Sequence, residues 1–276
     1  MEIKTDRMTE YAFLNGKIMP IENANLNITD LALLRGYGVF DFFKAMDGRP
    51  IFMEDHLDRF ENSTWLLGLK IPYSREELRR NILELIRINN HNLLGVKLVC
   101  TGGYSLDGYN PAEIPNLFMV AKPFKMHPFE KGLKLLTVEH QRELAEIKSI
   151  NYVKPISVMA HLHSSASDDV LYHTDGHVTE SSRSNIFIVK NGVLITPDAG
   201  ILRGITRKRI LQFAPKVMPV EVRSVTLEEV MAADEVFMTG STKRIAPITM
   251  IDNKAFEIGN NTQKLYDMLL EEEKLG

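Results

Sequence analysis

Cysteine is almost absent from this sequence, with Cys100 as its single representative. One thiol cannot form a disulfide within the chain, so a hydrophobic core must hold the fold. This usage fits a reducing compartment, and we predict a cytoplasmic protein. Long apolar runs are also missing, because no stretch approaches about 18 uninterrupted apolar residues. The opening sequence MEIKTDRMTEY contains no apolar leader. We therefore expect neither a membrane span nor a secretory signal.

An excess of one charge sign is missing too. The 33 Lys and Arg residues are balanced by 36 Asp and Glu residues, for a formal net charge of -3. This balance disfavours a nucleic-acid or membrane-surface partner. Metal-binding patterns are also lacking, since the eight histidines are scattered and no HExxH motif or cysteine cluster is present. We predict no metal site. The Gly102-Gly103 pair lacks the spacing of a Walker or dinucleotide-binding loop.

Turn and capping signals mark the elements of the first half. Asn-Gly and Asp-Gly pairs between apolar runs predict hairpins over Tyr11–Ile21 and Val39–Phe52. Ser74 and Glu77 have the spacing of a capping box before an amphipathic helix. Short apolar strands are expected on both sides of the polar, glycine-rich loop Thr101–Pro115, which is long enough to shape a site.

Similar signals organise the second half. A helix is expected over Asn151–Ser164, with its regular part after Pro155. Another is expected to begin at Gly204, and Thr226 with Glu229 has the spacing of a second capping box. Strands and helices alternate without a regular βαβ rhythm, which predicts an α+β or irregular α/β fold and excludes a doubly wound sheet.

The segment 122–132, KPFKMHPFEKG, carries two prolines and several charges. Such a composition is typical of a domain boundary. We predict an N-terminal domain over residues 1–121, a linker over 122–132 and a C-terminal domain over 133–276.

Two segments carry residues suited to chemistry, Lys148–Tyr152 (KSINY) and Thr179–Phe187 (TESSRSNIF). Taken alone, Lys148 would be a surface lysine after a polar stretch, because lysines are mostly exposed. Lys154 is a second lysine nearby, but it precedes Pro155 and does not have the position that Lys148 has relative to these two segments.

Further segments extend the pattern in a fixed order: Arg35–Asp41 (RGYGVFD), His56–Arg59 (HLDR), Gly204–Arg207 (GITR) and Thr239–Thr242 (TGST). Together with the two segments above, they resemble the fold-type IV enzymes that depend on pyridoxal phosphate (PLP). The resemblance implies a small N-terminal α/β domain and a larger C-terminal domain with a pseudo-barrel sheet. It also implies PLP in the cleft between them and a homodimer whose partner chain completes part of the site.

The resemblance also implies roles for individual residues. Lys148 would bind PLP covalently and carry a proton, and Glu180 would keep the pyridine nitrogen protonated. Tyr152 would donate to the phenolic oxygen of the cofactor, although a core role is equally open. The phosphate would be held by a guanidinium, by a helix N-terminus and by a polar turn. The residues in question are Arg59, Ile205, Thr206, Ser241 and Thr242. For Arg59, an ion pair with Asp55 on an exposed helix face is the alternative.

The substrate carboxylate requires a cation, and the candidates are Arg183, Lys97 and Arg35. A structural salt bridge is at least as plausible for each of them. Relatives specific for D-amino acids have KSLN at the lysine and use an Arg-x-His pair in the loop that corresponds to Thr101–Pro115, where this chain has none. Branched-chain aminotransferases carry K-x-G-x-N-Y, one residue longer than Lys148–Tyr152.

The leading prediction is therefore a D-amino-acid transaminase that uses a 2-oxo acid such as 2-oxoglutarate, with Lys97 or Arg183 in place of the missing pair. A branched-chain L-amino-acid aminotransferase remains open. Another alternative is an aminodeoxychorismate lyase, because Gly102–Ser105 resembles the glycine-rich loop of those enzymes. A catalytically inactive PLP-binding relative is also open.

Overall fold

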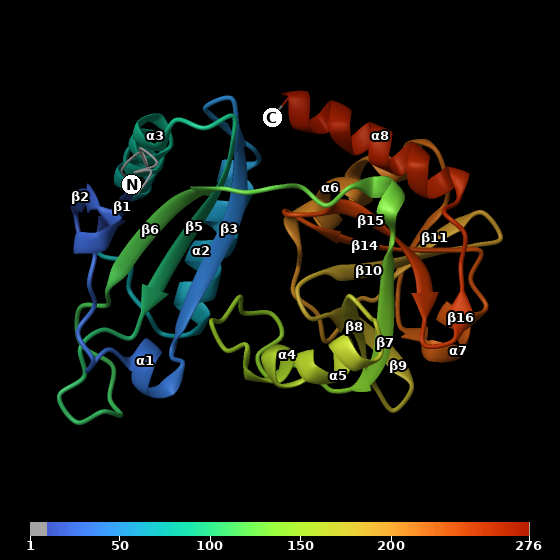
Figure 1. Ribbon diagram of the computed structural model, residues 1–276, viewed down its shortest axis with the longest axis horizontal. Coiled ribbons are helices and arrows are strands. Elements are labelled where there is room, and N and C mark those ends of the chain that lie inside the picture. The colour runs from blue at the N-terminus through green and yellow to red at the C-terminus, as the bar shows by residue number, and fades with distance from the viewer. Residues whose placement is uncertain (1–9, 276) are drawn as a thin grey trace, which may run out of the picture. The chain divides into compact units, whose positions relative to one another are not determined.

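The computed structural model describes residues 10–275, which divide into two compact units (Figure 1). The first unit runs to Lys125 and includes Ile147–Asn151, and the second contains Met126–Glu146 and the chain from Tyr152 onward. The division after Lys125 lies inside the segment 122–132 expected as a boundary. The short segment with Lys148 was expected in the second domain but belongs to the first unit.

The first unit is built on a six-stranded antiparallel sheet in the order β2-β1-β6-β5-β3-β4. Its strands are β1 (Tyr11–Leu14), β2 (Lys17–Pro20), β3 (Gly38–Met46), β4 (Arg49–Pro50), β5 (Leu93–Thr101) and β6 (Leu117–Pro123). Its helices are α1 (Leu31–Arg35), α2 (Met53–Leu66) and α3 (Arg75–Asn89), with the 3-10 turn η1 (Ile21–Asn23).

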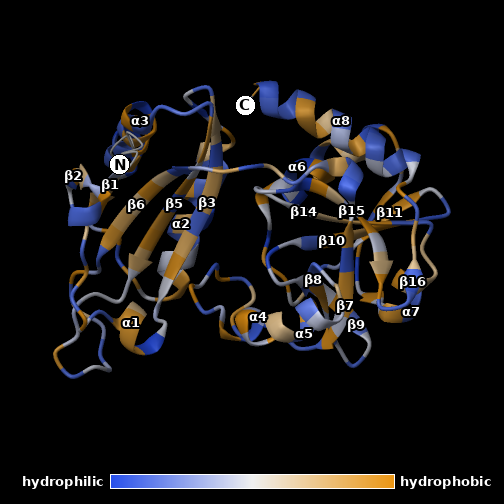
Figure 2. Ribbon diagram, in the orientation of Figure 1, coloured by the Kyte–Doolittle hydropathy of each residue, from blue (hydrophilic) through white to orange (hydrophobic). Residues whose placement is uncertain are grey.

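Both predicted hairpins of this unit are confirmed. Asn15 and Asp47 adopt positive φ angles of 45° and 49° at their turns, a conformation that asparagine and aspartate tolerate. The capping box of α3 is present, with Ser74 and Glu77 satisfying one another's backbone N–H groups. Helices α2 and α3 pack their apolar faces, including Phe60 and Ile82, on the alternating buried side chains of the sheet. Figure 2 shows β3, β5 and β6 as predominantly hydrophobic ribbons.

The second unit contains a ten-stranded sheet that closes on itself. The strand order β12-β11-β10-β14-β15-β7-β8-β9-β13 is completed by a pairing of β9 with β10 at Glu180 and Asn185. Six strands (β10, β14, β15, β7, β8 and β9) thus form a ring, which confirms the expected pseudo-barrel. The apolar side chains of the ring form a core of their own.

The elements of the second unit have the following bounds. The strands are β7 (Leu133–Glu139), β8 (Asp169–Thr174), β9 (His177–Ser181), β10 (Asn185–Lys190), β11 (Val193–Thr196), β12 (Val220–Val222), β13 (Val225–Thr226), β14 (Glu235–Gly240), β15 (Arg244–Ile251) and β16 (Lys254–Ala255). The helices are α4 (Val153–Ser157), α5 (Met159–Ser164), α6 (Ile205–Phe213), α7 (Leu227–Met231) and α8 (Asn260–Leu275), with the 3-10 turns η2 (Phe129–Lys131) and η3 (Ala214–Lys216).

Two local predictions in this unit need correction. The helix expected over Asn151–Ser164 is two short helices, α4 and α5, and Pro155 lies inside α4. A proline in the first turn of a helix is tolerated because its N–H would have no partner there. The second capping box is only half formed. Thr226 accepts from the backbone N–H of Glu229, but the carboxylate of Glu229 binds Arg223.

Among residues 10–275, no helix combines the length and the hydropathy needed to cross a bilayer.

Candidate functional site

The segment around Lys148 is fixed along the free edge of β3. The backbone N–H of Phe40 donates to the carbonyl of Lys148 (2.8 Å), and the N–H of Ile150 donates to that of Gly38 (3.0 Å). A Cβ atom on Gly38 would lie 2.8 Å from the carbonyl oxygen of Cys100. Position 38 therefore requires glycine, because a side chain there would collide with the backbone of the neighbouring strand β5.

Two lysine amines lie over one aromatic ring in this unit. The Nζ atom of Lys148 is 4.6 Å from the centroid of the Phe40 ring, and the Nζ atom of Lys97 is 5.5 Å from the same centroid. Both distances allow attraction between the cation and the π face of the ring. Lys97 projects from β5 opposite Phe42 and is exposed. Of the three candidates for the substrate carboxylate, Lys97 thus shares an aromatic neighbour with Lys148.

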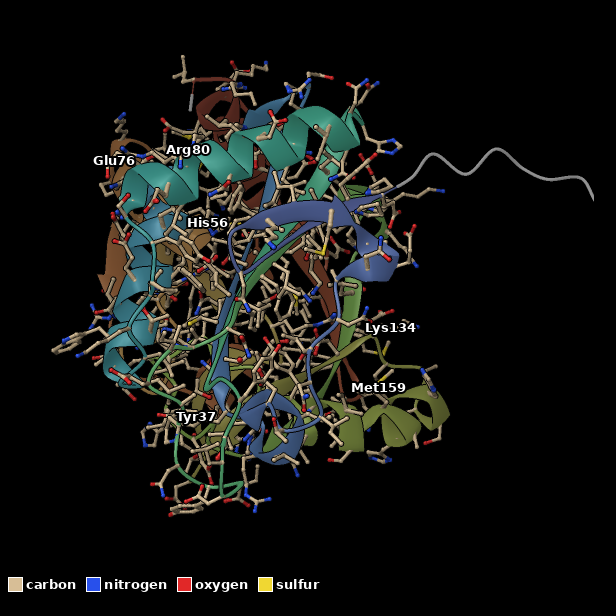
Figure 3. All side chains as sticks on the ribbon, turned by 90° about the vertical axis from the view of Figure 1, so that its left-hand side faces the viewer. Tyr37, His56, Glu76, Arg80, Lys134 and Met159 are labelled. Atoms are coloured by element: carbon tan, nitrogen blue, oxygen red, sulfur yellow. The ribbon has the colours of Figure 1, made fainter. Side chains whose placement is uncertain are left out.

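The neighbouring strand residue, Asp41, organises a buried polar group with Arg59 and His56. Arg59 donates to the two carboxylate oxygens of Asp41 through Nε and Nη2, both at 2.8 Å. The Nδ1 atom of His56 is 2.7 Å from the carboxylate of Asp41. His56 and Arg59 are three residues apart on α2, so their side chains point to the same side of the helix. Figure 3 labels His56 among the interior side chains of this unit.

The charge states of this group follow from its surroundings. Burial acts to raise the pKa of Asp41, but Arg59 and His56 outweigh it and hold that pKa well below its usual range. Burial lowers the pKa of His56 despite the nearby carboxylate. The group is therefore an anion, a cation and a neutral imidazole. The expected alternative, in which Arg59 pairs with Asp55 on an exposed face, is not the ion pair that the structure shows.

Arg35 ends α1 as an exposed side chain, and it donates to the carbonyl of Leu34 (3.0 Å). This contact is local and structural.

In the second unit, the carboxylate of Glu180 is buried at the end of β9 with 5% of the residue exposed. The Nε atom of Arg142 donates to Oε1 (2.9 Å), and the backbone N–H of Leu202 donates to Oε2 (2.9 Å). Asn185 donates through Nδ2 to the carbonyl of Leu202 (2.7 Å). One residue, Leu202, thus connects Glu180 and Asn185 to the chain that leads into α6.

The N-terminus of α6 has the features of an anion site. Its N-cap, Gly204, makes no side-chain capping bond, and Ile205 and Thr206 are buried. A Cβ atom on Gly204 would lie 2.1 Å from the Oδ1 atom of Asn185, so the backbone needs glycine here for space. The first N–H groups of a helix lack partners within it and attract a phosphate together with the helix dipole.

Three buried hydroxyls have no hydrogen-bond partner among the described residues. They belong to Ser181 at the end of β9, Ser184 just before β10 and Thr239 near the end of β14. Buried polar groups are usually paired, so orphaned ones indicate a ligand or water that would satisfy them. Together with Glu180 and the α6 terminus, these donors fit a molecule that carries a phosphate and a protonated ring nitrogen, as PLP does.

The remaining predicted residues lie on turns and helix ends of the second unit. Ser241 and Thr242 form the turn between β14 and β15. Arg183 is exposed in the turn between β9 and β10, and its carbonyl oxygen would lie 3.6 Å from a Cβ atom on Gly240. These two turns are therefore neighbours. Tyr152 is half-buried at the N-cap of α4.

Three residues that contact candidate site residues were not predicted from the sequence: Asp41 and His56 in the first unit and Arg142 in the second. Asp41 and His56 were inside quoted motifs, but nothing in their spacing predicted that they meet. Arg142 lies six residues before Lys148 in a polar stretch without a recognisable pattern.

Comparison with known proteins identifies the family. The model of the family described as amino-transferase class IV matches residues 38–251. A putative branched-chain-amino-acid aminotransferase from Methanocaldococcus jannaschii is 34% identical over 92% of this chain and 93% of its own length. A D-alanine aminotransferase from Listeria monocytogenes is 33% identical over 94% of both chains.

The solved structures agree with these matches. The crystal structure of a branched-chain aminotransferase from Thermoproteus uzoniensis with norvaline has a TM-score of 0.88 and 28% identity, covering 95% of this chain and 94% of that one. A second branched-chain amino acid aminotransferase, crystallised with pyridoxamine 5'-phosphate, has a TM-score of 0.89 and 27% identity, covering 95% of this chain and 93% of that one. The fold, the buried acid and the phosphate-suited helix end are consistent with this similarity. The chain therefore belongs to the class IV amino-transferases and is a PLP-dependent aminotransferase.

Proposed function

We propose that this enzyme transfers an amino group between a D-amino acid and a 2-oxo acid, with Lys97 binding the α-carboxylate of the substrate. The observation that carries the proposal is the position of the Lys97 and Lys148 amines over the single ring of Phe40. A cation that shares an aromatic neighbour with the reactive amine can hold an anionic group near the atom that reacts. The KSIN sequence at Lys148 supports the D-amino-acid branch, and Lys97 replaces the missing Arg-x-His pair.

Each remaining residue has a role in this scheme. PLP, when bound, supplies an electron sink for the charge that develops at the substrate Cα. The amine of Lys148 would hold the cofactor covalently and carry the proton that leaves the substrate Cα. Glu180 would keep the pyridine nitrogen protonated. The α6 terminus, Arg59, Ser241 and Thr242 would supply donors to the phosphate, and Tyr152 would supply one to the phenolic oxygen.

The test is a panel of donors with the purified enzyme, PLP and 2-oxoglutarate. D-alanine and D-glutamate are expected to be donors, and L-leucine is not. Lys97→Met should raise the KM for the D-amino acid at least about tenfold, because a charge-assisted bond to the carboxylate is lost. Arg183→Met is the matched comparison. If only Arg183→Met raises KM, the clamp is assigned to the wrong residue, and activity with L-leucine alone overturns the D-amino-acid assignment.

A branched-chain L-amino-acid aminotransferase is the second candidate. It is favoured by the names of the Methanocaldococcus relative and of the Thermoproteus structure. The same panel separates the two functions, since L-leucine should then react and D-alanine should not. Release of pyruvate from aminodeoxychorismate would indicate the lyase instead.

We also propose a cytoplasmic homodimer. The single cysteine, Cys100, is buried and unpaired, which fits a reducing compartment. The first unit exposes several large apolar side chains on α1 and on the loop that hydrogen-bonds to the start of that helix, where a second copy would cover them. They include Leu33, Leu106, Tyr109 and Ile114. Light scattering at micromolar concentration should give twice the chain mass, and Leu106→Glu should reduce it.

A further inference from the structure

The buried group of Asp41, His56 and Arg59 has a feature that its pairing alone does not explain. Asp41 occupies the Nε and Nη2 atoms of Arg59, and His56 also approaches Nη2 at 3.3 Å. The Nη1 atom has no hydrogen-bond partner among residues 10–275. The side chain of Arg59 is only 10% exposed. Asp41 thus holds the Nε and Nη2 side of a largely buried guanidinium, and Nη1 is available to bind a ligand.

We infer that Asp41 and His56 are positioning residues that orient Arg59 so that Nη1 meets the phosphate of the cofactor. This inference rests on the proposed role of Arg59 as a phosphate ligand. A free arginine side chain loses rotamer entropy when it is immobilised. The two-point contact with Asp41 fixes the planar guanidinium before the phosphate arrives, so less entropy is lost on binding.

His56 completes the arrangement without adding charge. An ionised Asp41 can only accept hydrogen bonds, so the Nδ1–H of His56 must donate to it. The imidazole also packs against the ring of Phe43, with 5.4 Å between the centroids. Burial lowers the pKa of His56, so the neutral imidazole donates to Asp41 without placing a second cation beside Arg59. The Asp41–Arg59 ion pair then has no net charge.

The effect of removing the Asp41 carboxylate shows whether Arg59 acts through its orientation or only through its charge. If Arg59 acted only through its charge, removing the nearby Asp41 carboxylate would strengthen phosphate binding. If Asp41 positions Arg59, the same change weakens binding although it makes the site more positive. The sign of the effect of Asp41→Asn therefore decides between the two.

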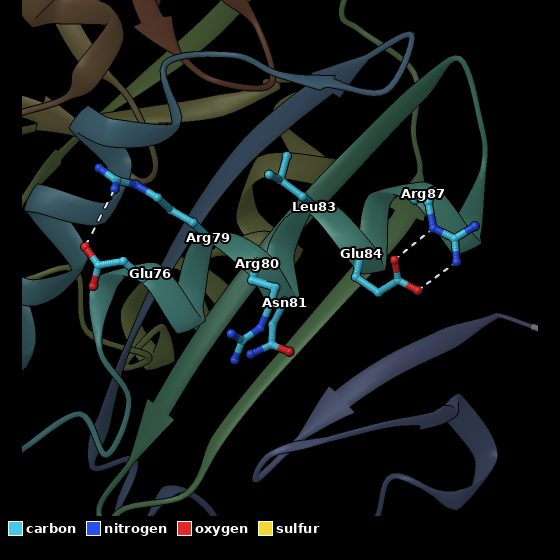
Figure 4. A pocket seen from close by; sticks show the side chains of 7 residues that line it. All are labelled: Glu76, Arg79, Arg80, Asn81, Leu83, Glu84 and Arg87. Carbon is cyan, nitrogen blue, oxygen red and sulfur yellow. Dashed lines mark hydrogen bonds and ion pairs between the residues drawn. The ribbon is translucent and has the colours of Figure 1, made fainter.

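The exposed arginines of α3 supply a charge control. In Figure 4, Glu84 and Arg87 form a two-point pair on this helix, with hydrogen bonds of 2.7 and 2.8 Å. Their side chains are 43% and 70% exposed. Glu84→Gln changes the net charge by the same amount as Asp41→Asn, in the same unit, without contact with Arg59.

A buried control is also available in the first unit. Asp30 is 1% exposed and accepts from Ala32, Thr101 and Asn116, each at 2.7 Å. Asp30→Asn therefore tests what the loss of a buried, fully bonded carboxylate does to the unit in general.

The experiment compares the affinity of each variant, freed of its cofactor, for PLP and for pyridoxal, which lacks the phosphate. Asp41→Asn should weaken PLP binding about tenfold, the equivalent of one charge-assisted hydrogen bond, and leave pyridoxal binding unchanged. Asp30→Asn and Glu84→Gln should leave the ratio of the two affinities as in the wild type. Inorganic phosphate should compete with PLP less well in Asp41→Asn than in the wild type.

The possible failures are distinct. If the wild type shows no visible absorbance with PLP and borohydride traps nothing on Lys148, the proposed function fails. If the wild type binds PLP but Asp41→Asn has the same or a higher preference for PLP over pyridoxal, the positioning role is overturned. If Asp41→Asn does not fold, His56→Leu decides, because it keeps the ion pair and removes one donor. A ratio equal to the wild type in that variant also overturns the inference.

Discussion

Replacing Arg142 with methionine tests how the buried acid of the second unit is stabilised. The side chains of Arg142 and Glu180 are 16% and 6% exposed, and their ion pair is 2.9 Å long. Methionine preserves much of the volume and removes the charge. The Glu180 carboxylate would keep the N–H of Leu202 as a donor but lose its guanidinium.

The magnitude follows from desolvation. Removing one partner of a buried ion pair leaves an uncompensated charge and costs about 3–5 kcal/mol. In a unit of this size, each kcal/mol corresponds to roughly 2–4 °C in the melting temperature. We expect Arg142→Met to melt at least about 6 °C below the wild type. Because Leu202 links Glu180 to the start of α6, the affinity for PLP should fall as well.

A double-mutant cycle provides the decisive assay. Glu180→Gln removes the charge that Arg142 compensates, so the double variant Arg142→Met/Glu180→Gln should be more stable than the sum of the single effects by about 1–3 kcal/mol. Thermal melts of all four proteins without cofactor give this coupling energy. Additive effects, or an Arg142→Met variant that melts with the wild type, would refute the view that Arg142 stabilises the charge of Glu180.

Three further predictions follow from local geometry. Gly204→Ala should weaken PLP binding and lower the melting temperature, because its Cβ would collide with Asn185; titration and a thermal melt check this. Cys100 should resist thiol reagents at pH 8 in the folded protein, since burial raises its pKa to about 12; colorimetric titration before and after denaturation checks this. The pKa of His56 is lowered on folding, so the unfolded chain binds a proton first and stability should fall as the pH drops below about 6.5. His56→Gln should remove that part of the pH dependence, as urea unfolding at pH 7.5 and 5.5 would show.

Local signals predicted the local structure well, for physical reasons. The hairpin turns depend on two residues each, and the capping box of α3 depends on Ser74 and Glu77, so the information lies within a few positions. Where a local pattern competed with a tertiary contact, prediction failed. Glu229 had capping-box spacing, but Arg223 offers it two charged hydrogen bonds that a backbone N–H cannot match.

The candidate site shows the same limit. The motifs around Lys148 and Glu180 were visible in the sequence, but their partners were not. Arg142 and Glu180 are 38 residues apart, and only the closed sheet brings them together. For Arg59, helical spacing suggested Asp55, whereas the structure pairs it with Asp41 on a strand 18 residues earlier. A buried carboxylate needs a cation far more than an exposed one does, so burial decides the partner.

Strand β3 explains how one short stretch serves two purposes in the first unit. Phe40 and Asp41 are adjacent, and successive side chains of a strand point to opposite faces. The ring of Phe40 contacts the two lysine amines, and Asp41 points into the interior, where it pairs with Arg59. A register slip of one residue would exchange these faces and destroy both groups together. The nine paired residues between β3 and β5, and the contact that requires glycine at position 38, oppose such a slip. Under the proposed roles of Lys148 and Arg59, the register of β3 would matter for function, because it determines which face presents Phe40 to the lysine amines and which face presents Asp41 to the guanidinium.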